Sequence, residues 1–312
     1  MKLILTLSAL LALGYQTASA TSLLETFGSG DNAFTMEFVP IGNAGNAADT
    51  TGSPNPAGSV AYTYNLGMYE VSRDMITKAN SAGSLGITMY DMSSLGGNGV
   101  NRPATGVTWN EAAIYVNWLN TNQGYQAAYK FSGSTFELWS STDAGYNANN
   151  LFRNSLAKYV IASSSEWYKG AYGNLDGTWN NYATGSDSAP TPVDSGTVAN
   201  TAVYGESGPA DITSAGGLSP WGTMGQGGNV WEWTESAYNG GDGNADLDRE
   251  FRGGAWDDNN VDLSASFRYS NNPTDNTGDL GFRVASVPEP SALSLLAIGL
   301  SGLALVRRRK QS

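Results

Sequence analysis

Two tryptophans flank one glutamate in the segment GNVWEW. In an extended segment the side chains alternate between faces, so Trp231 and Trp233 share one face and Glu232 points to the other. The tryptophans supply a large buried area, and a carboxylate held against a core is costly without a partner. We expect either a bound cation or an arginine to satisfy Glu232, and Arg252 and Arg283 are the two arginine candidates.

The chain contains no cysteine and no histidine. Thiolate and imidazole sites for copper, iron or zinc are therefore excluded, as is serine or cysteine catalysis with a histidine base. Carboxylate and carbonyl oxygens remain as ligands for hard cations. The composition thus leaves a hard cation such as Ca²⁺ as a possible metal where carboxylates converge.

Two groups of residues in polar loops are candidates for ligand binding. Asp257 and Asp258, with Asp262, could supply the paired carboxylates of a glycoside-cleaving enzyme, although a solvated loop or a cation site is the favoured interpretation because no pattern sets their separation. Trp179 and Trp221 could stack on a ligand. The remaining tryptophans of the recognisable motifs are expected in the core: Trp109, Trp167, Trp231, Trp233 and Trp256.

The elements that would position these residues are short. Alternating segments predict strands at 34–39 and 60–66. A short helix is predicted over 73–80 with Ser72 as its N-cap. Capping boxes open two further helices, at Thr108 with Glu111 and at Ser163 with Glu166, the second ending near Gly173. Short strands and long loops are expected over 175–286, so the chain is predicted to form one loop-rich α+β domain with two main helices near its middle.

Both ends of the chain carry sorting signals. Lys2, an apolar run over 3–13 and Ala18-Ser19-Ala20 are typical of a secretory signal peptide covering residues 1–20. At the other end, residues 287–312 contain Pro-Glu-Pro, a short apolar run over 292–306 and an Arg-rich tail. This order resembles the PEP-CTERM sorting signal of Gram-negative bacteria, which implies an exosortase-type protease as partner and a short transmembrane helix before processing. A permanent single-span anchor is the alternative.

The intervening segment, residues 21–286, is strongly acidic. Of 16 basic and 28 acidic residues in the chain, the terminal signals hold five and one, which leaves 11 against 27 and a net charge of −16. Such a surface repels nucleic acid, so no nucleic-acid partner is expected, and it attracts cations. The protein is predicted to be exported to the cell envelope or extracellular matrix, anchored at the inner membrane transiently or permanently.

Six motifs in one order carry a family resemblance: YEVS (69–72), PATGVTWNEAAIYVNWL (103–119), ASSSEWYKGAY (162–172), GNVWEW, RGGAW and GFRVA. The chain resembles the formylglycine-generating enzyme (sulfatase-modifying factor) domain, which implies a C-type-lectin-like fold over residues 21–286. The family's oxidase holds copper through two cysteines after RGG, and ungapped counting places them near Asp258 and Leu263. Without cysteine, that oxidase activity is not expected here.

The resemblance also implies structural Ca²⁺. One family site corresponds to the carbonyls of Gly228 and Val230 and the side chain of Glu232. The family has Asp or Asn where this chain has Gly225, so one ligand is missing. A second site would use Asn200, the carbonyl of Thr201, Asp211 and the carbonyl of Thr213. The alternative for Glu232 is a salt bridge in the core, and Arg252, Gly253, Gly254 and Arg283 are expected to act structurally.

Three functions follow from this combination. The first is an exported, non-catalytic protein that binds an extracellular ligand, such as exopolysaccharide or another cell-surface component, with Trp179, Trp221, Asp257 and Asp258 as its candidate contacts. The second is an enzyme of altered chemistry, either a carboxylate-based hydrolase or a cation-dependent modifying enzyme. The third is a passive structural component of the surface or matrix. Retention of a scaffold alone does not choose between them.

Overall fold

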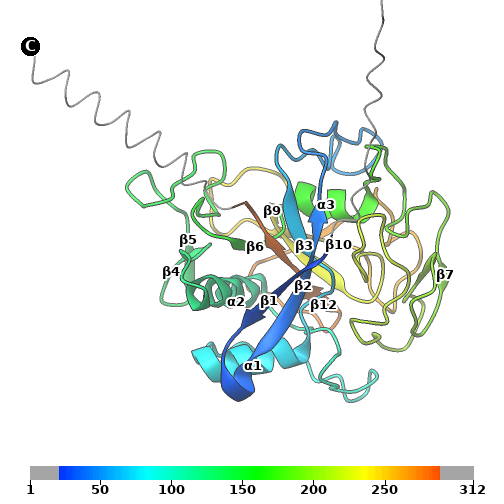
Figure 1. Cartoon of the computed structure of the whole chain (residues 1–312), viewed down its shortest axis with the longest axis horizontal. Helices are drawn as coiled ribbons and strands as arrows, with labels where there is room; N and C mark the ends of the chain where they lie inside the picture. The colour runs from blue at the N-terminus through cyan, green and yellow to red at the C-terminus, as the bar shows by residue number, and fades with distance from the viewer. Residues whose placement is uncertain (1–20, 289–312) are drawn as a thin grey trace, which may run out of the picture.

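The computed structural model describes residues 21–288 (Figure 1). These residues form three α-helices and two larger sheets, with long loops between them. The helices are α1 (Arg73–Gly83), α2 (Trp109–Asn122) and α3 (Ser164–Tyr172), with a short 3₁₀ helix, η1, at Gly30–Asn32. The α+β, loop-rich character predicted from the sequence is confirmed.

The first sheet has five antiparallel strands in the order β1-β2-β3-β13-β6. Their bounds are β1 (Leu23–Phe27), β2 (Phe34–Ile41), β3 (Tyr64–Gly67), β13 (Val284–Ser286) and β6 (Tyr159–Ile161). The C-terminal strand β13 thus lies between strands from the first two thirds of the described chain. Such non-local pairing makes the sheet a product of the whole domain.

The second sheet has four strands in the order β11-β10-β9-β12, and β12 runs parallel to β9. Their bounds are β11 (Tyr269–Asn271), β10 (Arg249–Arg252), β9 (Trp231–Ala237) and β12 (Leu280–Phe282). Two small pairs complete the strands: β4 (Lys130–Ser132) with β5 (Thr135–Glu137), and β7 (Thr191–Pro192) with β8 (Thr201–Ala202). The loops around β7 gather on one side of the molecule (Figure 1).

The predicted helix starts are confirmed. Ser72 accepts a hydrogen bond from the Met75 N–H, and both capping boxes have their reciprocal bonds, at Thr108 with Glu111 and at Ser163 with Glu166. The two main helices predicted from the sequence are α2 and α3. The short helix predicted over 73–80 is α1, which extends three residues further, to Gly83.

The predicted strand boundaries are less accurate. The strand expected over 60–66 begins only at Tyr64, because the preceding residues form bends. Strand β1 was not predicted. It lies at the edge of its sheet, and its apolar residues Leu23 and Leu24 are exposed, so the strand lacks the alternation of buried and exposed side chains. Gly173 follows the last residue of α3 and has φ of −79°, so α3 does not end in the left-handed turn that would require glycine at this position.

Strand β9 carries GNVWEW into the core. Trp231, Glu232 and Trp233 are all buried, so both faces of this strand are covered by other parts of the protein. The Trp233 indole donates to the carbonyl of Val107, and the Trp109 indole donates to the carbonyl of Thr234. These two bonds fasten the start of α2 to β9.

A single residue connects the two large sheets. β12 belongs to the four-stranded sheet and β13 to the five-stranded one, with only Arg283 between them. Arg283 is therefore held where the sheets meet. Among residues 21–288 no helix has the length and apolarity needed to cross a bilayer; the predicted signal peptide and the apolar run 292–306 lie outside the described residues.

Candidate functional site

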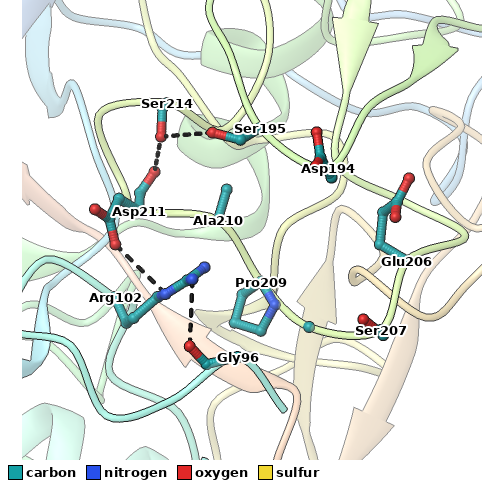
Figure 2. Close-up of a pocket in the computed structure, with 11 residues that line it drawn as sticks. Gly96, Arg102, Asp194, Ser195, Glu206, Ser207, Pro209, Ala210, Asp211 and Ser214 are labelled. Atoms are coloured by element: carbon teal, nitrogen blue, oxygen red, sulfur yellow. Dashed lines mark hydrogen bonds and ion pairs between the residues drawn. The ribbon is translucent and has the colours of Figure 1, made fainter.

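A polar cavity of about 290 Å³ opens between three loops (Figure 2). One loop contributes Gly96 and Arg102, the second Asp194 and Ser195, and the third runs from 206 to 214. The cavity's polar side chains are Arg102, Asp194, Ser195, Glu206, Ser207, Asp211 and Ser214. Hydroxyl, carboxylate and guanidinium groups dominate this wall, so the cavity is suited to a ligand rich in hydrogen-bonding groups.

The guanidinium of Arg102 is anchored at one end of the cavity. Its Nε lies 3.4 Å from Oδ1 of Asp211, and its Nη2 donates to the Gly96 carbonyl at 3.3 Å. Its Nη1 has no partner among the described residues. Arg102 is thus held in place while donors remain available to a ligand.

The opposite end of the cavity is acidic. Figure 2 shows Asp194 and Glu206 across from Arg102 and Asp211. Within residues 21–288, neither the Asp194 nor the Glu206 carboxylate has a hydrogen-bond or ion-pair partner. One arginine against three carboxylates gives the cavity a negative field, which disfavours an anionic ligand.

The loop that carries Asp257 and Asp258 adjoins this cavity. The Glu206 N–H donates to the Trp256 carbonyl at 2.6 Å, and the Gly205 N–H donates to the Asp258 carbonyl at 3.0 Å. Burial raises the pKa of Asp258 to about 6; the Ala255 N–H opposes the rise, and the neighbouring Asp262 and Asp257 add to it. Asp257 and Asp258 do not line the cavity, so these two predicted ligand contacts lie outside it.

Trp179 and Trp221 come together elsewhere. Both are half-buried and approach Gly173, and the hollow they line measures only about 10 Å³. The Trp179 ring packs against Tyr168, with centroids 5.5 Å apart. The structure therefore brings the two predicted aromatic residues together, but it leaves no room between them for a sugar ring.

A second cluster is fully buried and centres on Glu232. Nε and Nη2 of Arg283 reach the two carboxylate oxygens at 2.6 and 2.5 Å, and the Trp167 indole donates to Oε2 at 2.6 Å. Of the two arginine candidates, Arg283 is thus the partner of Glu232. Arg252 instead bonds Glu250 at 2.6 Å and the carbonyl of Ser53.

The two glycines after Arg252 are needed for backbone reasons. Gly253 and Gly254 have φ of 103° and 74°, a region that side chains rarely adopt. A Cβ on Gly253 would lie 2.9 Å from the Gln226 carbonyl, and one on Gly254 would press on Leu263. The segment turns here so that Arg252 points inward.

The family model for the sulfatase-modifying factor enzyme 1-like domain matches residues 32–287. The chain belongs to this family. A second model, the PEP-CTERM protein-sorting motif, matches residues 286–310. Comparison with curated proteins finds no match.

Solved structures share the family's fold. Treponema denticola variable protein 1 superposes with a TM-score of 0.61 at 20% identity, covering 86% of this chain and 100% of that one. CarF gives 0.58 at 20% identity over 81% and 98%, and PvdO from Pseudomonas aeruginosa gives 0.53 at 17% over 85% and 98%. At these identities the likeness is one of fold.

Ungapped counting from RGG predicted that the family's copper-holding cysteines would fall near Asp258 and Leu263. Asp258 uses its Oδ2 to accept the Ala255 N–H at 2.8 Å. Leu263 is fully buried, and its carbonyl accepts the Tyr172 hydroxyl. An apolar side chain and a carboxylate that caps a turn do not provide the soft ligands of a copper site.

The second predicted calcium set is spread over different partners. The Asn200 side chain accepts from Thr184, the Thr201 carbonyl from the Gly217 N–H, and Asp211 pairs with Arg102, while Thr213 is exposed. Residues 21–288 contain no group of three or more acidic side chains placed to hold a metal ion. A cation at this set stays a prediction.

Proposed function

We propose that this protein is an exported, non-catalytic member of the sulfatase-modifying factor family, and that it binds an extracellular polyhydroxylated ligand in the cavity around Arg102. The observation that carries the proposal is the cavity itself: an anchored guanidinium with a spare Nη1 faces two carboxylates that have no partner within residues 21–288. Donors on one side and acceptors on the other suit the hydroxyl groups of a saccharide.

The charge of the cavity narrows the ligand class. Three carboxylates surround one arginine, so a uronic acid or a sulfated sugar would meet net repulsion. A neutral or amino sugar would instead use its hydroxyl and ammonium donors on Asp194 and Glu206. We therefore propose an uncharged or cationic exopolysaccharide segment as the ligand.

The replacement of the copper-holding cysteines supports a non-catalytic role. Asp258 and Leu263 are engaged in turn capping and core packing. Incubation of the purified protein with a cysteine-containing sulfatase peptide is expected to give no aldehyde by mass spectrometry, and aldehyde formation would contradict the proposal.

Binding can be tested with Arg102→Ala. We expect calorimetry with a neutral oligosaccharide chosen from a glycan array to show at least a tenfold loss of affinity, about 1.4 kcal/mol. The free energy of unfolding should change by less than about 1 kcal/mol, since the Arg102–Asp211 pair is partly exposed to solvent. Lys130→Ala removes a partly exposed charge that pairs with Asp143 in the β4–β5 region and serves as the control. Equal affinity of wild type and Arg102→Ala would contradict the proposed site.

A second candidate, an enzyme of altered chemistry, is favoured by one observation. Asp258 is half-buried beside Asp262, with a pKa raised to about 6 by burial, as a proton-transferring carboxyl requires. If this candidate holds, replacing both aspartates with Asn abolishes turnover of a glycan substrate while the melting temperature is unchanged. Unchanged turnover in that variant would reject it.

We further propose that an exosortase-type protease processes the chain at its PEP-CTERM motif and that the product resides in the cell envelope or matrix. The match over residues 286–310 supports this proposal. Mass spectrometry of the mature protein should find a C-terminus near Pro288-Glu289-Pro290. An intact Arg-rich tail would instead favour permanent retention.

A further inference from the structure

Another polar cavity, of about 490 Å³, lies between the start of α3, the end of β9 and strand β10. It is larger than the cavity around Arg102 and shares no lining residue with it. None of the positions to which the family resemblance assigns copper or calcium lines it. Its volume lies within the range typical of small-molecule sites, so it has room for a small ligand.

The one carboxylate in the wall of this cavity is fully engaged. Glu250 is 1% exposed. Its Oε1 accepts the Ser164 hydroxyl at 2.5 Å and Nε of Arg252 at 2.6 Å, and its Oε2 accepts Nη1 of Arg268 at 2.7 Å. Glu250 thus links the start of α3 to the Arg268 guanidinium on one wall, and its oxygens are already occupied by charge-assisted and hydroxyl donors.

Arg268 is held in place but has donors left over. Its Nε donates to the Ser53 hydroxyl at 3.2 Å, its Nη1 also donates to the Tyr238 carbonyl at 2.7 Å, and its Cζ lies 4.1 Å from the centre of the Tyr238 ring. Its Nη2, with two N–H groups, has no partner among the residues that the structure describes. The guanidinium is therefore ordered before a ligand arrives, which lowers the entropy cost of binding.

Serine hydroxyls add further donors to the wall. The hydroxyls of Ser163 and Ser236 accept the N–H groups of Glu166 and Ser164, and neither donates to a residue within 21–288. The Ser165 hydroxyl also lines the cavity and has no partner in the same range. Because the side chains of this wall offer more free donors than free acceptors, the complementary ligand is one that presents acceptors.

The charges around the cavity limit the charge of that ligand. Glu166 and Glu235 both pair with Arg153, at 2.8 and 2.7 Å. Together with the Glu250 cluster, this gives three carboxylates and three guanidinium groups. A bound monoanion adds one uncompensated negative charge to this balanced set, whereas a phosphate dianion adds two in a partly buried place. The cavity therefore favours a monovalent oxyanion.

We propose that this cavity binds the carboxylate or sulfate group of an acidic saccharide, with Nη2 of Arg268 as the main donor and the serine hydroxyls beside it as further donors. The planar guanidinium matches an oxyanion with two parallel N–H groups. The site is independent of the cavity around Arg102, whose carboxylates favour a neutral or cationic ligand. The two cavities would therefore take saccharides of different charge.

Glucuronate and glucose 6-sulfate are the probes, and glucose and inorganic phosphate at pH 8 are the neutral and dianionic comparisons, all followed by ligand-observed NMR. We expect at least one of the two monoanions to bind the wild type roughly tenfold or more tightly than glucose and phosphate do, and the one that binds identifies the group. Arg268→Gln should lose this binding by a similar factor. Arg102→Ala should bind as the wild type does, which separates this site from the cavity around Arg102.

Asn239 tests the site without disturbing its ion pairs. It is exposed, lines the cavity, and its side chain has no bond within residues 21–288. Asn239→Asp should weaken binding of the monoanion and Asn239→Lys should strengthen it, each by roughly fivefold. The same exchanges at Asn276, which is exposed and does not line the cavity, are the matched controls.

Three results overturn the proposal: a wild type that binds neither monoanion, a wild type that binds glucose or phosphate as tightly, or Asn239→Asp and Asn239→Lys variants with equal affinities. Loss of binding in Arg102→Ala with retention in Arg268→Gln would also overturn it, because the anion would then occupy the other cavity. If Arg268→Gln does not fold, the Asn239 and Asn276 variants decide the outcome.

Discussion

The ion pair of Glu166 with Arg153 provides the sharpest test of how the core is held together. Glu166 is the N3 residue of α3 and is 1% exposed. Nη1 and Nη2 of Arg153 reach its two oxygens at 3.0 and 2.8 Å, and the Tyr62 hydroxyl and Ser163 N–H also donate to it. Glu166→Gln removes the charge and preserves the shape.

The magnitude follows from the pKa of Glu166. Burial alone would raise it, but Arg153 and the hydrogen bonds outweigh burial and lower the pKa from 4.5 to about 2. That difference corresponds to about 3 kcal/mol of stability. Because the folded-state pKa is depressed, this contribution is present above pH 4.5 and is lost as the pH falls toward 2.

Urea unfolding followed by tryptophan fluorescence at pH 7, 5 and 3 measures the effect. We expect Glu166→Gln to be less stable than the wild type by about 3 kcal/mol at pH 7, and the difference to shrink as the pH falls below 4.5. Glu111→Gln is the matched control: Glu111 is the N3 residue of α2 with the same capping box, but its partners Thr88 and Thr108 are neutral. Its loss should be about 1 kcal/mol. A Glu166→Gln deficit that is equal at pH 3 and pH 7 would refute the reasoning.

Two further predictions concern the cluster around Glu232. Arg283→Met leaves that carboxylate buried without its cation and should cost roughly 3–5 kcal/mol in urea unfolding; a loss below 1 kcal/mol would mean that water reaches Glu232. Trp167→Phe should cost about 1.5–3 kcal/mol more than Trp221→Phe, because the Trp167 indole donates to a carboxylate while the buried Trp221 Nε1 has no partner. Equal losses for the two tryptophans would show that packing alone decides both.

Local chemistry made the helix starts predictable. Ser72, Thr108 and Ser163 are caps that act on backbone groups three residues away, so neighbouring residues contain the whole interaction. The absence of cysteine and histidine likewise excluded soft-metal chemistry without any coordinates. The six ordered motifs were sufficient to indicate the family, which its model then confirmed over residues 32–287.

The partner of Glu232 was not decided by local sequence. Arg252 is 20 residues away along the chain and Arg283 is 51, and each lies in a glycine-containing motif. Strand pairing brings both arginines near Glu232, Arg252 directly opposite it on β10 and Arg283 just after β12, which pairs in parallel with β9. Arg283 is the partner because its side chain points to Glu232, whereas the Arg252 side chain bonds Glu250 and the Ser53 carbonyl. Strand pairing over such separations is not encoded in any short window.

The cavity around Arg102 escaped sequence analysis for the same reason. Its three walls come from residues 96–102, 194–195 and 206–214, none of which contains a recognisable motif. Trp179 and Trp221, chosen because aromatic residues in polar loops often meet ligands, instead line a hollow beside Gly173 that is too small for a ligand. Side-chain type is a property of the chain, but which loops converge and which rings remain uncovered is settled by packing among distant segments.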